Sequence, residues 1–375
     1  MKISAFHPYD KLDIDFLEKY DKVSEVFLKG PAGEIGSARE NAYDPSESEL
    51  RKLCQKLHDR GFEVNVVLNA TCFGGEQFRD EWIRKTVDVL TTLASMGVDS
   101  LTVADPYLIE LINYYALPFK VTVSCLAFVT TPMKARYFDE IGVDRITLPP
   151  DVNRDLDTIR MIRKAVKCDL SMIVNEGCLL NCPYRYFCYN YITHRSTGPT
   201  EALLVLKTGT FMRAMANDFY VMEEMSMKKK HPHLLLTSPW VRPENLKEYE
   251  NLGITHFKLS GRNKPHIFLE RCLEAYHSGS YEGNIFDIID NGVRLAIDLR
   301  YLTCGVTVYY INNKELDGFF KKVTSCSKNC TECNFCEEFA KEKIAINKEV
   351  PQEDLQRVLQ PGIYEWPLPY DHFRG

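Results

Sequence analysis

The sequence predicts an α/β fold of the (β/α)8 TIM type, a closed barrel of parallel strands, followed by a small C-terminal cysteine-rich appendage. One pattern occurs four times: an amphipathic helix, a glycine and a short apolar strand, with the glycines at Gly61, Gly97, Gly142 and Gly253. Such a glycine suits the left-handed position that ends a helix. A helix followed by a buried strand is the repeating unit of a parallel sheet. Eight candidate strands within about 260 residues favour a closed barrel over an open sheet.

The predicted strands are short apolar segments, at 2–6, 23–28, 62–69, 100–104, 119–124, 144–148, 169–174 and 255–259. The spacing breaks between the last two, where a cysteine-containing loop, a predicted helix near 200–207 and a lysine run at 228–230 intervene. We expect the lysine run to form a solvated turn. The pattern ends near residue 290, so residues 1–290 are assigned to the barrel and 291–375 to the appendage.

Composition and charge limit the classes of function. Hydrophobic residues make up 45% and charged residues 26%, which is ordinary for a globular protein. The net charge of −6 gives no support for a nucleic-acid surface, although this charge still allows a local basic groove. No apolar run reaches the roughly 18–20 residues that a membrane helix needs. The N-terminal segment lacks the apolar core of a signal peptide. We therefore expect a cytoplasmic protein without a membrane segment.

Thirteen cysteines are the main compositional anomaly. Thiols stay reduced in the cytoplasm, so clustered cysteines in such a protein indicate metal binding rather than disulfides. Seven of the thirteen fall into two tight groups, one directly after the seventh predicted strand and one in the appendage.

Polar side chains follow several predicted strands, and the C-terminal ends of the strands carry the active site of such barrels. We expect Glu176 and Asn175 to position a substrate, Arg262 and Lys29 to meet an anionic group, and Asp105 to join them as a catalytic candidate. Alone, any one of these residues also suits a helix cap. Further residues at the same rim are His7, Asn69, Ser124, Asp151 and Ser260.

The first cysteine group is Cys178, Cys182 and Cys188. Thiolates held this close repel one another unless a cation neutralises them. Zinc prefers four closed ligands, so three irregularly spaced cysteines fit a 4Fe–4S cluster better, with a distant fourth ligand. Cys72 and Cys125 are the candidates for that ligand, and Cys72 is preferred because its loop can reach inward. Ordinary packing of the thiols is the alternative.

The second group is Cys326, Cys330, Cys333 and Cys336, four cysteines within eleven residues. It predicts a second metal site, either a 4Fe–4S cluster or zinc. The first three match the C-x3-C-x2-C spacing of radical S-adenosylmethionine enzymes. That interpretation stays a minor alternative, because the loop follows the barrel, Glu332 replaces the usual aromatic residue, and Cys336 can close the open iron site.

Three segments resemble the family catalogued as peptidase U32: VNEGCLLNCPYRYFC, SPWVRPENLKEYENLGITHFKLSGR and AYHSGSYEGN. The resemblance covers roughly residues 1–290. It implies a 4Fe–4S cluster held by barrel cysteines, as in family members that hydroxylate ubiquinone precursors or RNA pyrimidines without oxygen. The four-cysteine group lies outside the shared barrel.

We therefore expect an iron–sulfur oxidoreductase that performs oxygen-independent hydroxylation or a related group transfer on a small anionic, aromatic or nucleotide-type substrate. A second hypothesis is a non-catalytic iron–sulfur subunit of a heteromeric complex. The expected partners are the substrate and either an electron donor or a second U32-like subunit. Peptide hydrolysis, which the family name suggests, is a minor alternative.

Overall fold

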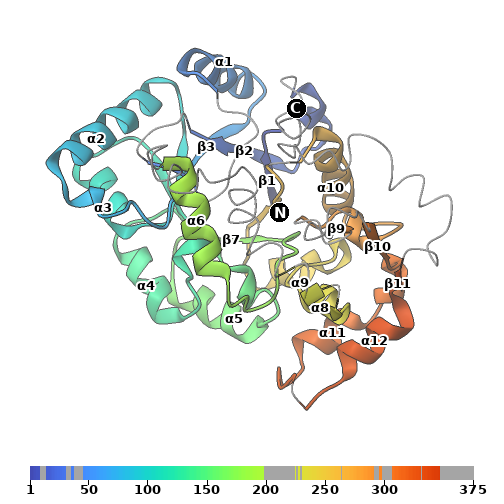
Figure 1. Ribbon diagram of the computed structural model, residues 1–375. Coiled ribbons are helices and arrows are strands. Elements are labelled where there is room, and N and C mark those ends of the chain that lie inside the picture. Colours follow the sequence, from blue (N-terminus) through green and yellow to red (C-terminus); the bar gives the residue numbers. More distant parts are fainter. Residues whose placement is uncertain are drawn as a thin grey trace, which may run out of the picture.

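The computed structural model contains the predicted closed barrel of eight parallel strands (Figure 1). The structure describes residues 1–8, 14–30, 35–37, 45–197, 224, 227, 228, 230–262, 264–290, 295–297, 306–330 and 332–346. The barrel strands are β1 (Lys2–Phe6), β2 (Val23–Lys29), β3 (Glu63–Leu68), β4 (Ser100–Val103), β5 (Lys120–Val123), β6 (Arg145–Leu148), β7 (Asp169–Ile173) and β8 (His256–Lys258). Each strand pairs with the next, and β8 pairs with β1 to close the barrel. All eight predicted strands are confirmed.

Helices follow the strands and cover the outside of the barrel (Figure 1). They are α1 (Glu47–His58), α2 (Asp80–Ser95), α3 (Pro106–Tyr114), α4 (Pro132–Glu140), α5 (Leu156–Ala165), α9 (Leu246–Asn251) and α10 (His266–Ser278). Short 3-10 turns lie at Asp15–Lys19, Glu76–Phe78, Cys125–Ala127, Pro150–Val152, Pro243–Asn245, Ile285–Asp287 and Asn313–Leu316. Gly97 and Gly253 follow their helices with φ of 87° and 88°. These left-handed values confirm the predicted helix ends.

Among the described residues, α6 (Arg185–Thr197) and α8 (His233–Thr237) precede α9 in the long connection between β7 and β8. The helix expected near 200–207 lies outside the described residues. The prediction of a solvated turn is wrong for Lys228, which is only 3% exposed. Its ammonium donates a hydrogen bond to the Gly177 carbonyl at 2.6 Å and pairs with Glu224. A backbone carbonyl and a carboxylate therefore replace the water that we expected around this lysine.

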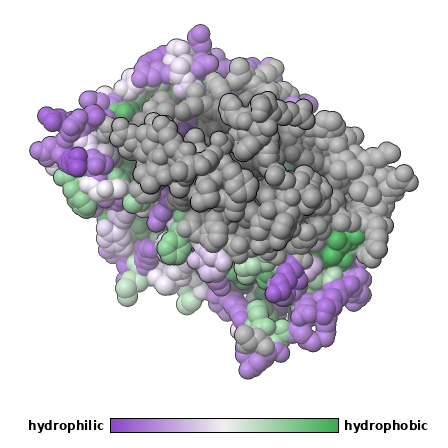
Figure 2. Space-filling view, in the orientation of Figure 1, coloured by the Kyte–Doolittle hydropathy of each residue, from purple (hydrophilic) through white to green (hydrophobic). Residues whose placement is uncertain are grey.

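The appendage contains a small antiparallel sheet and two helices. The sheet has the order β11 (Ala345–Ile346), β10 (Val306–Tyr310), β9 (Leu295–Ile297), and the helices are α11 (Phe319–Thr324) and α12 (Phe335–Lys343). Buried residues such as Tyr309, Leu316 and Phe319 join the same hydrophobic core as the barrel. On the face shown in Figure 2, hydrophilic side chains gather over α11 and α12 at the lower right. The appendage thus packs one face on the barrel and exposes the other.

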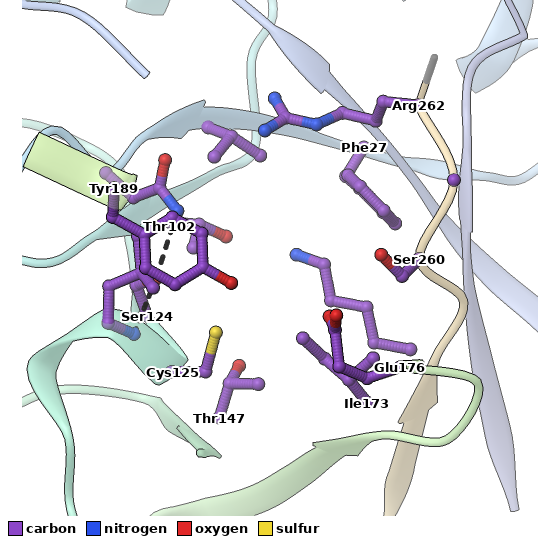
Figure 3. Close-up of a pocket in the computed structure, with 15 residues that line it drawn as sticks. Phe27, Thr102, Ser124, Cys125, Thr147, Ile173, Glu176, Tyr189, Ser260 and Arg262 are labelled. Carbon is purple, nitrogen blue, oxygen red and sulfur yellow. Dashed lines mark hydrogen bonds between the residues drawn. The ribbon is translucent and has the colours of Figure 1, made fainter. Parts of the chain in front are cut away.

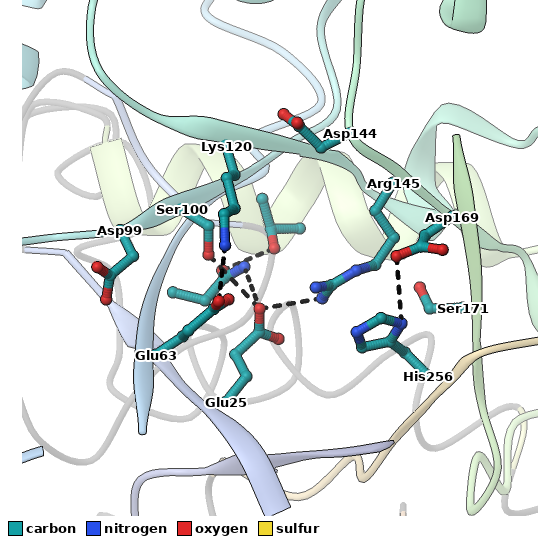
Figure 4. Close-up of polar contacts among 12 residues, drawn as sticks. Glu25, Glu63, Asp99, Ser100, Lys120, Asp144, Arg145, Asp169, Ser171 and His256 are labelled. Carbon is teal, nitrogen blue, oxygen red and sulfur yellow. Dashed lines mark hydrogen bonds and ion pairs between the residues drawn. The ribbon is translucent and has the colours of Figure 1, made fainter. Parts of the chain in front are cut away.

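The barrel interior is polar, whereas such barrels are usually filled by branched apolar side chains. Glu25 on β2 is 1% exposed and pairs with Arg145 on β6 at 3.0 Å. Asn65 and Ser100 donate hydrogen bonds to the same carboxylate at 3.3 and 3.5 Å (Figure 4). These groups form a charged layer inside the barrel.

Acidification is expected to destabilise the fold through His256, which lies in the same layer. Burial, and then the charge of Arg145, lowers the pKa of His256 from 6.5 to about 4. The unfolded chain therefore binds more protons than the folded chain between these two values, and stability falls as pH falls through this window. From pH 7 to pH 5 the loss from this residue should be on the order of 1 kcal/mol. Urea unfolding at both pH values tests this.

The variant His256→Gln serves as the control for the pH effect. It cannot take up the proton, so its stability should depend less on pH over the same range. An unchanged pH dependence in the variant would contradict the assignment.

Candidate functional site

A pocket opens at the C-terminal ends of the barrel strands (Figure 3). Its apolar lining comes from Phe27, Val67, Leu126 and Ile173. Its polar lining comes from Asn69, Thr102, Ser124, Cys125, Thr147, Glu176, Tyr189, Lys258, Ser260 and Arg262. Figure 3 shows Tyr189, Cys125, Glu176 and Arg262 around the pocket on different sides. The arrangement matches a small-molecule site, where apolar walls hold the ligand and a few polar groups orient it.

Two of the five predicted catalytic residues, Glu176 and Arg262, line this pocket. Asn175 instead joins the ends of β7 and β8, because its side chain donates to the Ser260 carbonyl at 2.9 Å and accepts from the Ser260 amide at 2.6 Å. Asp105 caps α3 by accepting a hydrogen bond from the Tyr107 amide at 2.8 Å. Lys29 ends β2 and is not among the lining residues. Asn175 and Asp105 thus hold the framework around the pocket.

The loop that carries the first cysteine group leaves the pocket directly after Glu176. Asp151, at the end of β6, accepts a hydrogen bond from the Asn181 amide at 2.8 Å and pairs with the buried Arg185 at 3.2 Å. Asn181 adopts a φ of 51°, a left-handed conformation that asparagine tolerates. The loop is thus fixed between the barrel rim and the start of α6.

Helix α6 lies along this rim. Thr71, in the loop after β3, donates a hydrogen bond to the Asn190 side chain at 2.6 Å. Tyr189 reaches the pocket, and Tyr186 stacks on Phe128 with 4.3 Å between ring centroids. Because Cys72 follows Thr71, these contacts bring its loop against the helix that carries Cys188.

Burial dominates the electrostatics of the thiols. It raises the pKa of Cys178 well above the usual value, and the charges of Glu176 and Glu224 act in the same direction. Burial raises the pKa of Cys182 as well. Both thiols lie near the Arg185 guanidinium, whose charge favours their ionised forms. A thiolate at Cys178 therefore needs a further cation to be stable.

The donor set fits an iron–sulfur cluster in its chemistry, with thiols around one rim and a buried guanidinium beside them. Among the residues that the structure describes, no three Cys, His, Asp or Glu side chains converge closely enough to hold a metal ion. None of the twelve described cysteines forms a disulfide.

The family model described as Peptidase family U32 matches residues 22–280, which include every barrel strand after β1 and the cysteine loop. The chain belongs to peptidase family U32. The predicted resemblance is thereby confirmed.

Two curated relatives and one solved structure are similar to this chain. An uncharacterized protease of Methanocaldococcus jannaschii, MJ1657, is 32% identical over 355 residues, which cover 92% of this chain and 99% of the relative. A 23S rRNA 5-hydroxycytidine synthase of Escherichia coli is 25% identical over 252 residues, which cover 67% of this chain but only 35% of that protein. The solved structure of the U32 peptidase Mk0906 is 26% identical, with a TM-score of 0.45, and the match covers 52% of this chain and 77% of that one.

The second cysteine group of this U32 protein lies between α11 and α12. Cys326, Cys330 and Cys333 are exposed, and Cys336 is half-buried in the first turn of α12. Burial raises the pKa of Cys336, and the charges of the other three thiols raise it further. The four sulfurs are thus close enough to interact electrostatically. The buried guanidinium of Arg154 lies beside them and favours the ionised form of Cys336.

Sequence reasoning missed four polar residues of the U32 pocket: Thr102, Thr147, Lys258 and Tyr189. A signal existed for Lys258, because a lysine in the middle of the buried strand ITHFKLS cannot be solvated in the usual way. Tyr189 carried no such signal, since its position depends on how α6 lies across the rim. Cys125, the less favoured candidate for the fourth cluster ligand, lines the pocket.

The described part of this U32 chain contains no helix with the length and apolar character needed to span a bilayer.

Proposed function

We propose that this U32 protein is an iron–sulfur enzyme that performs oxygen-independent hydroxylation, or a related group transfer, on a small anionic, aromatic or nucleotide-type molecule. One observation carries the proposal: the first cysteine loop begins at the pocket wall. Glu176 lines the pocket, and Cys178 follows two residues later. The hydroxycytidine synthase among the relatives supports a hydroxylation-type reaction.

The protein's own residues account for binding and orientation of the substrate. The Arg262 guanidinium is placed to pair with an anionic group. The Glu176 carboxylate can accept a hydrogen bond from a hydroxyl or amino group. Phe27 and Leu126 offer apolar surface for a ring, and Tyr189 covers the pocket from α6. When bound, a cluster would accept and pass on the electrons that leave the substrate in a hydroxylation, or would supply a Lewis-acidic iron atom.

Cys178, Cys182 and Cys188 are the proposed ligands of this cluster, with Cys72 as the fourth. We also propose a second metal site, an iron–sulfur cluster or zinc, at Cys326, Cys330, Cys333 and Cys336. An electron-donating protein, or a second U32-like subunit, is the proposed partner. The pocket lining that the structure describes contains no histidine, so it lacks the usual base of a serine or cysteine protease.

Replacing both Cys178 and Cys182 with alanine is expected to remove about four iron atoms per chain from anaerobically purified protein. Iron and acid-labile sulfide are quantified, and the visible charge-transfer absorption is recorded. Protein with both sites filled by iron should contain about eight iron atoms, and zinc in the appendage would leave about four.

The matched control is Cys168→Ala. Cys168 is half-buried just before β7, away from the rim, and its amide donates to Asp139. This variant should keep its full iron content. If the double variant keeps it too, the first cysteine group does not hold the cluster.

A further inference from the structure

Lys258 occupies a position that the proposed function does not explain. It lies on β8, where alternate residues face opposite sides of the sheet. Phe257 and Leu259, the residues on either side of Lys258, are fully buried. Lys258 instead lines the pocket together with Glu176 and Arg262. The side chain keeps part of its surface accessible. Its amino group is therefore held deep in the barrel and still open to a molecule in the pocket.

The Lys258 ammonium lies over an aromatic ring and has no ion-pair partner among the residues that the structure describes. Its nitrogen lies 3.9 Å from the centroid of the Phe27 ring. No residue within the described ranges accepts a hydrogen bond from this ammonium or forms an ion pair with it. The other buried cations differ, since Arg145 pairs with Glu25 and Lys228 pairs with Glu224. A cation left without a partner inside a pocket is suited to meet a ligand.

The same surroundings favour the neutral amine. Burial lowers the pKa of Lys258 to about 8. This value includes the charges of Glu25 and Cys125, which oppose the shift, and those of Arg262 and Arg145, which act in the same direction as burial. About half of the molecules would then carry a neutral amine near pH 8. A desolvated lysine next to another cation is a recognised way to obtain a nucleophilic amine.

We propose that Lys258 forms a reversible imine with a small aldehyde or ketone that carries a negative group. The nitrogen lone pair attacks the carbonyl carbon, a carbon–nitrogen bond forms, and the carbon–oxygen bond breaks. Both hydrogens of the amine leave with the oxygen as water, so the step needs no oxidant or reductant. Arg262, on the same wall, pairs with the negative group and orients the carbonyl toward the amine. The inference concerns the pocket of the proposed function and adds a covalent binding mode to it.

Reductive trapping tests the proposal on the full-length, anaerobically prepared protein. The probe is glyoxylate, a small aldehyde with one carboxylate, and sodium borohydride converts an imine into a stable amine. Intact-mass and peptide analysis should find one carboxymethyl group on Lys258, added at least about tenfold faster than on any surface lysine. Labelling spread over surface lysines without enrichment at Lys258 would overturn the proposal.

Three variants test the separate parts of the proposal. Lys258→Arg keeps the positive charge but cannot form an imine, so the fast labelling should disappear, whereas Lys120→Arg, at an exposed lysine, should leave it unchanged. Arg262→Met should slow labelling by glyoxylate about tenfold more than labelling by uncharged propanal, because loss of the cation raises the pKa of Lys258 for both probes but removes the carboxylate contact for glyoxylate alone. Equal slowing for both aldehydes would overturn the role of Arg262. Circular dichroism and thermal melting establish that each variant is folded.

Failure of this inference is separable from failure of the proposed function. Trapping at Lys258 does not need iron, so the Cys178→Ala/Cys182→Ala protein should still be labelled. Full iron content without trapping would overturn the imine alone. Trapping in protein that never binds iron would overturn the iron–sulfur assignment alone.

Discussion

Replacing Glu25 with alanine is expected to lower the free energy of unfolding by about 3–5 kcal/mol. The substitution removes one partner of a buried ion pair and leaves Arg145 charged inside the barrel. It also removes the acceptor for Asn65 and Ser100, which lie in the same layer (Figure 4). Burial opposes ionisation of Glu25, but the charges of Arg145 and Lys258 hold its pKa below the usual value. Urea unfolding followed by circular dichroism measures the loss.

Two comparisons make the Glu25 measurement specific. Glu63 on β3 and Lys120 on β5 also form an ion pair, across β4, with nitrogen and oxygen 2.6 Å apart, but both side chains are largely exposed. Glu63→Gln should therefore cost less than about 1 kcal/mol. The double variant Glu25→Met/Arg145→Met replaces both buried charges with apolar groups, and it should recover much of the stability lost in Glu25→Ala. If Glu25→Ala costs no more than Glu63→Gln, the charged layer does not stabilise the fold.

The barrel strands could be located from the sequence because each is short, apolar and preceded by a helix that ends at a glycine. Buried strands of a parallel sheet read as continuous apolar runs, and this signal is local. The charged layer could not be predicted in the same way. Glu25 and Arg145 are 120 positions apart, and only closure of the barrel brings β2 and β6 residues to the same depth. A single charge in an apolar strand indicates an inward polar group but does not identify its partner.

For the candidate site too, the sequence predicted what depends on local signals but not which contacts the folded chain makes. Glu176 and Arg262 were predictable because they follow strands β7 and β8 directly, and strand ends of a barrel meet at one rim. Asp105 and Asn175 satisfy the same criterion, yet they hold backbone groups of the framework. A sequence gives the position of a polar residue relative to its strand. It does not show whether a backbone amide or the pocket receives the side chain.

The polar barrel interior connects stability with the proposed chemistry. Lys258 lies above the charged layer, and the charge of Glu25 raises its pKa against the effect of burial. Neutralising Glu25 should therefore lower the pKa of Lys258 further and extend fast imine trapping to lower pH. The buried carboxylate thus has two roles, since it pairs with Arg145 and also sets the charge of the amine in the pocket.

Replacing Arg242 with methionine should lower the free energy of unfolding about as much as Glu25→Ala does, because Arg242 joins the barrel to the appendage. The guanidinium is buried and donates three hydrogen bonds of 2.9 Å, to the side chain of Asn313, the carbonyl of Leu316 and the carboxylate of Asp317. Methionine fills a similar volume but leaves the Asn313 and Leu316 oxygens without their donor. Hydrogen bonds to a charged group contribute about 1.5–3 kcal/mol each and do not add fully, so the expected loss is about 3–4 kcal/mol.

The loss of stability in Arg242→Met should be confined to the appendage, whereas the loss in Glu25→Ala should affect the whole fold. Limited proteolysis of Arg242→Met should cleave the appendage faster than the barrel, whereas Glu25→Ala should expose both parts together. The matched control is Asp317→Asn, because the Asp317 side chain is 79% exposed and its ion pair should contribute less than about 1 kcal/mol. If the appendage keeps its resistance to protease in Arg242→Met, the shared hydrophobic core alone holds it. In that case the cysteines between α11 and α12 remain in place without the guanidinium.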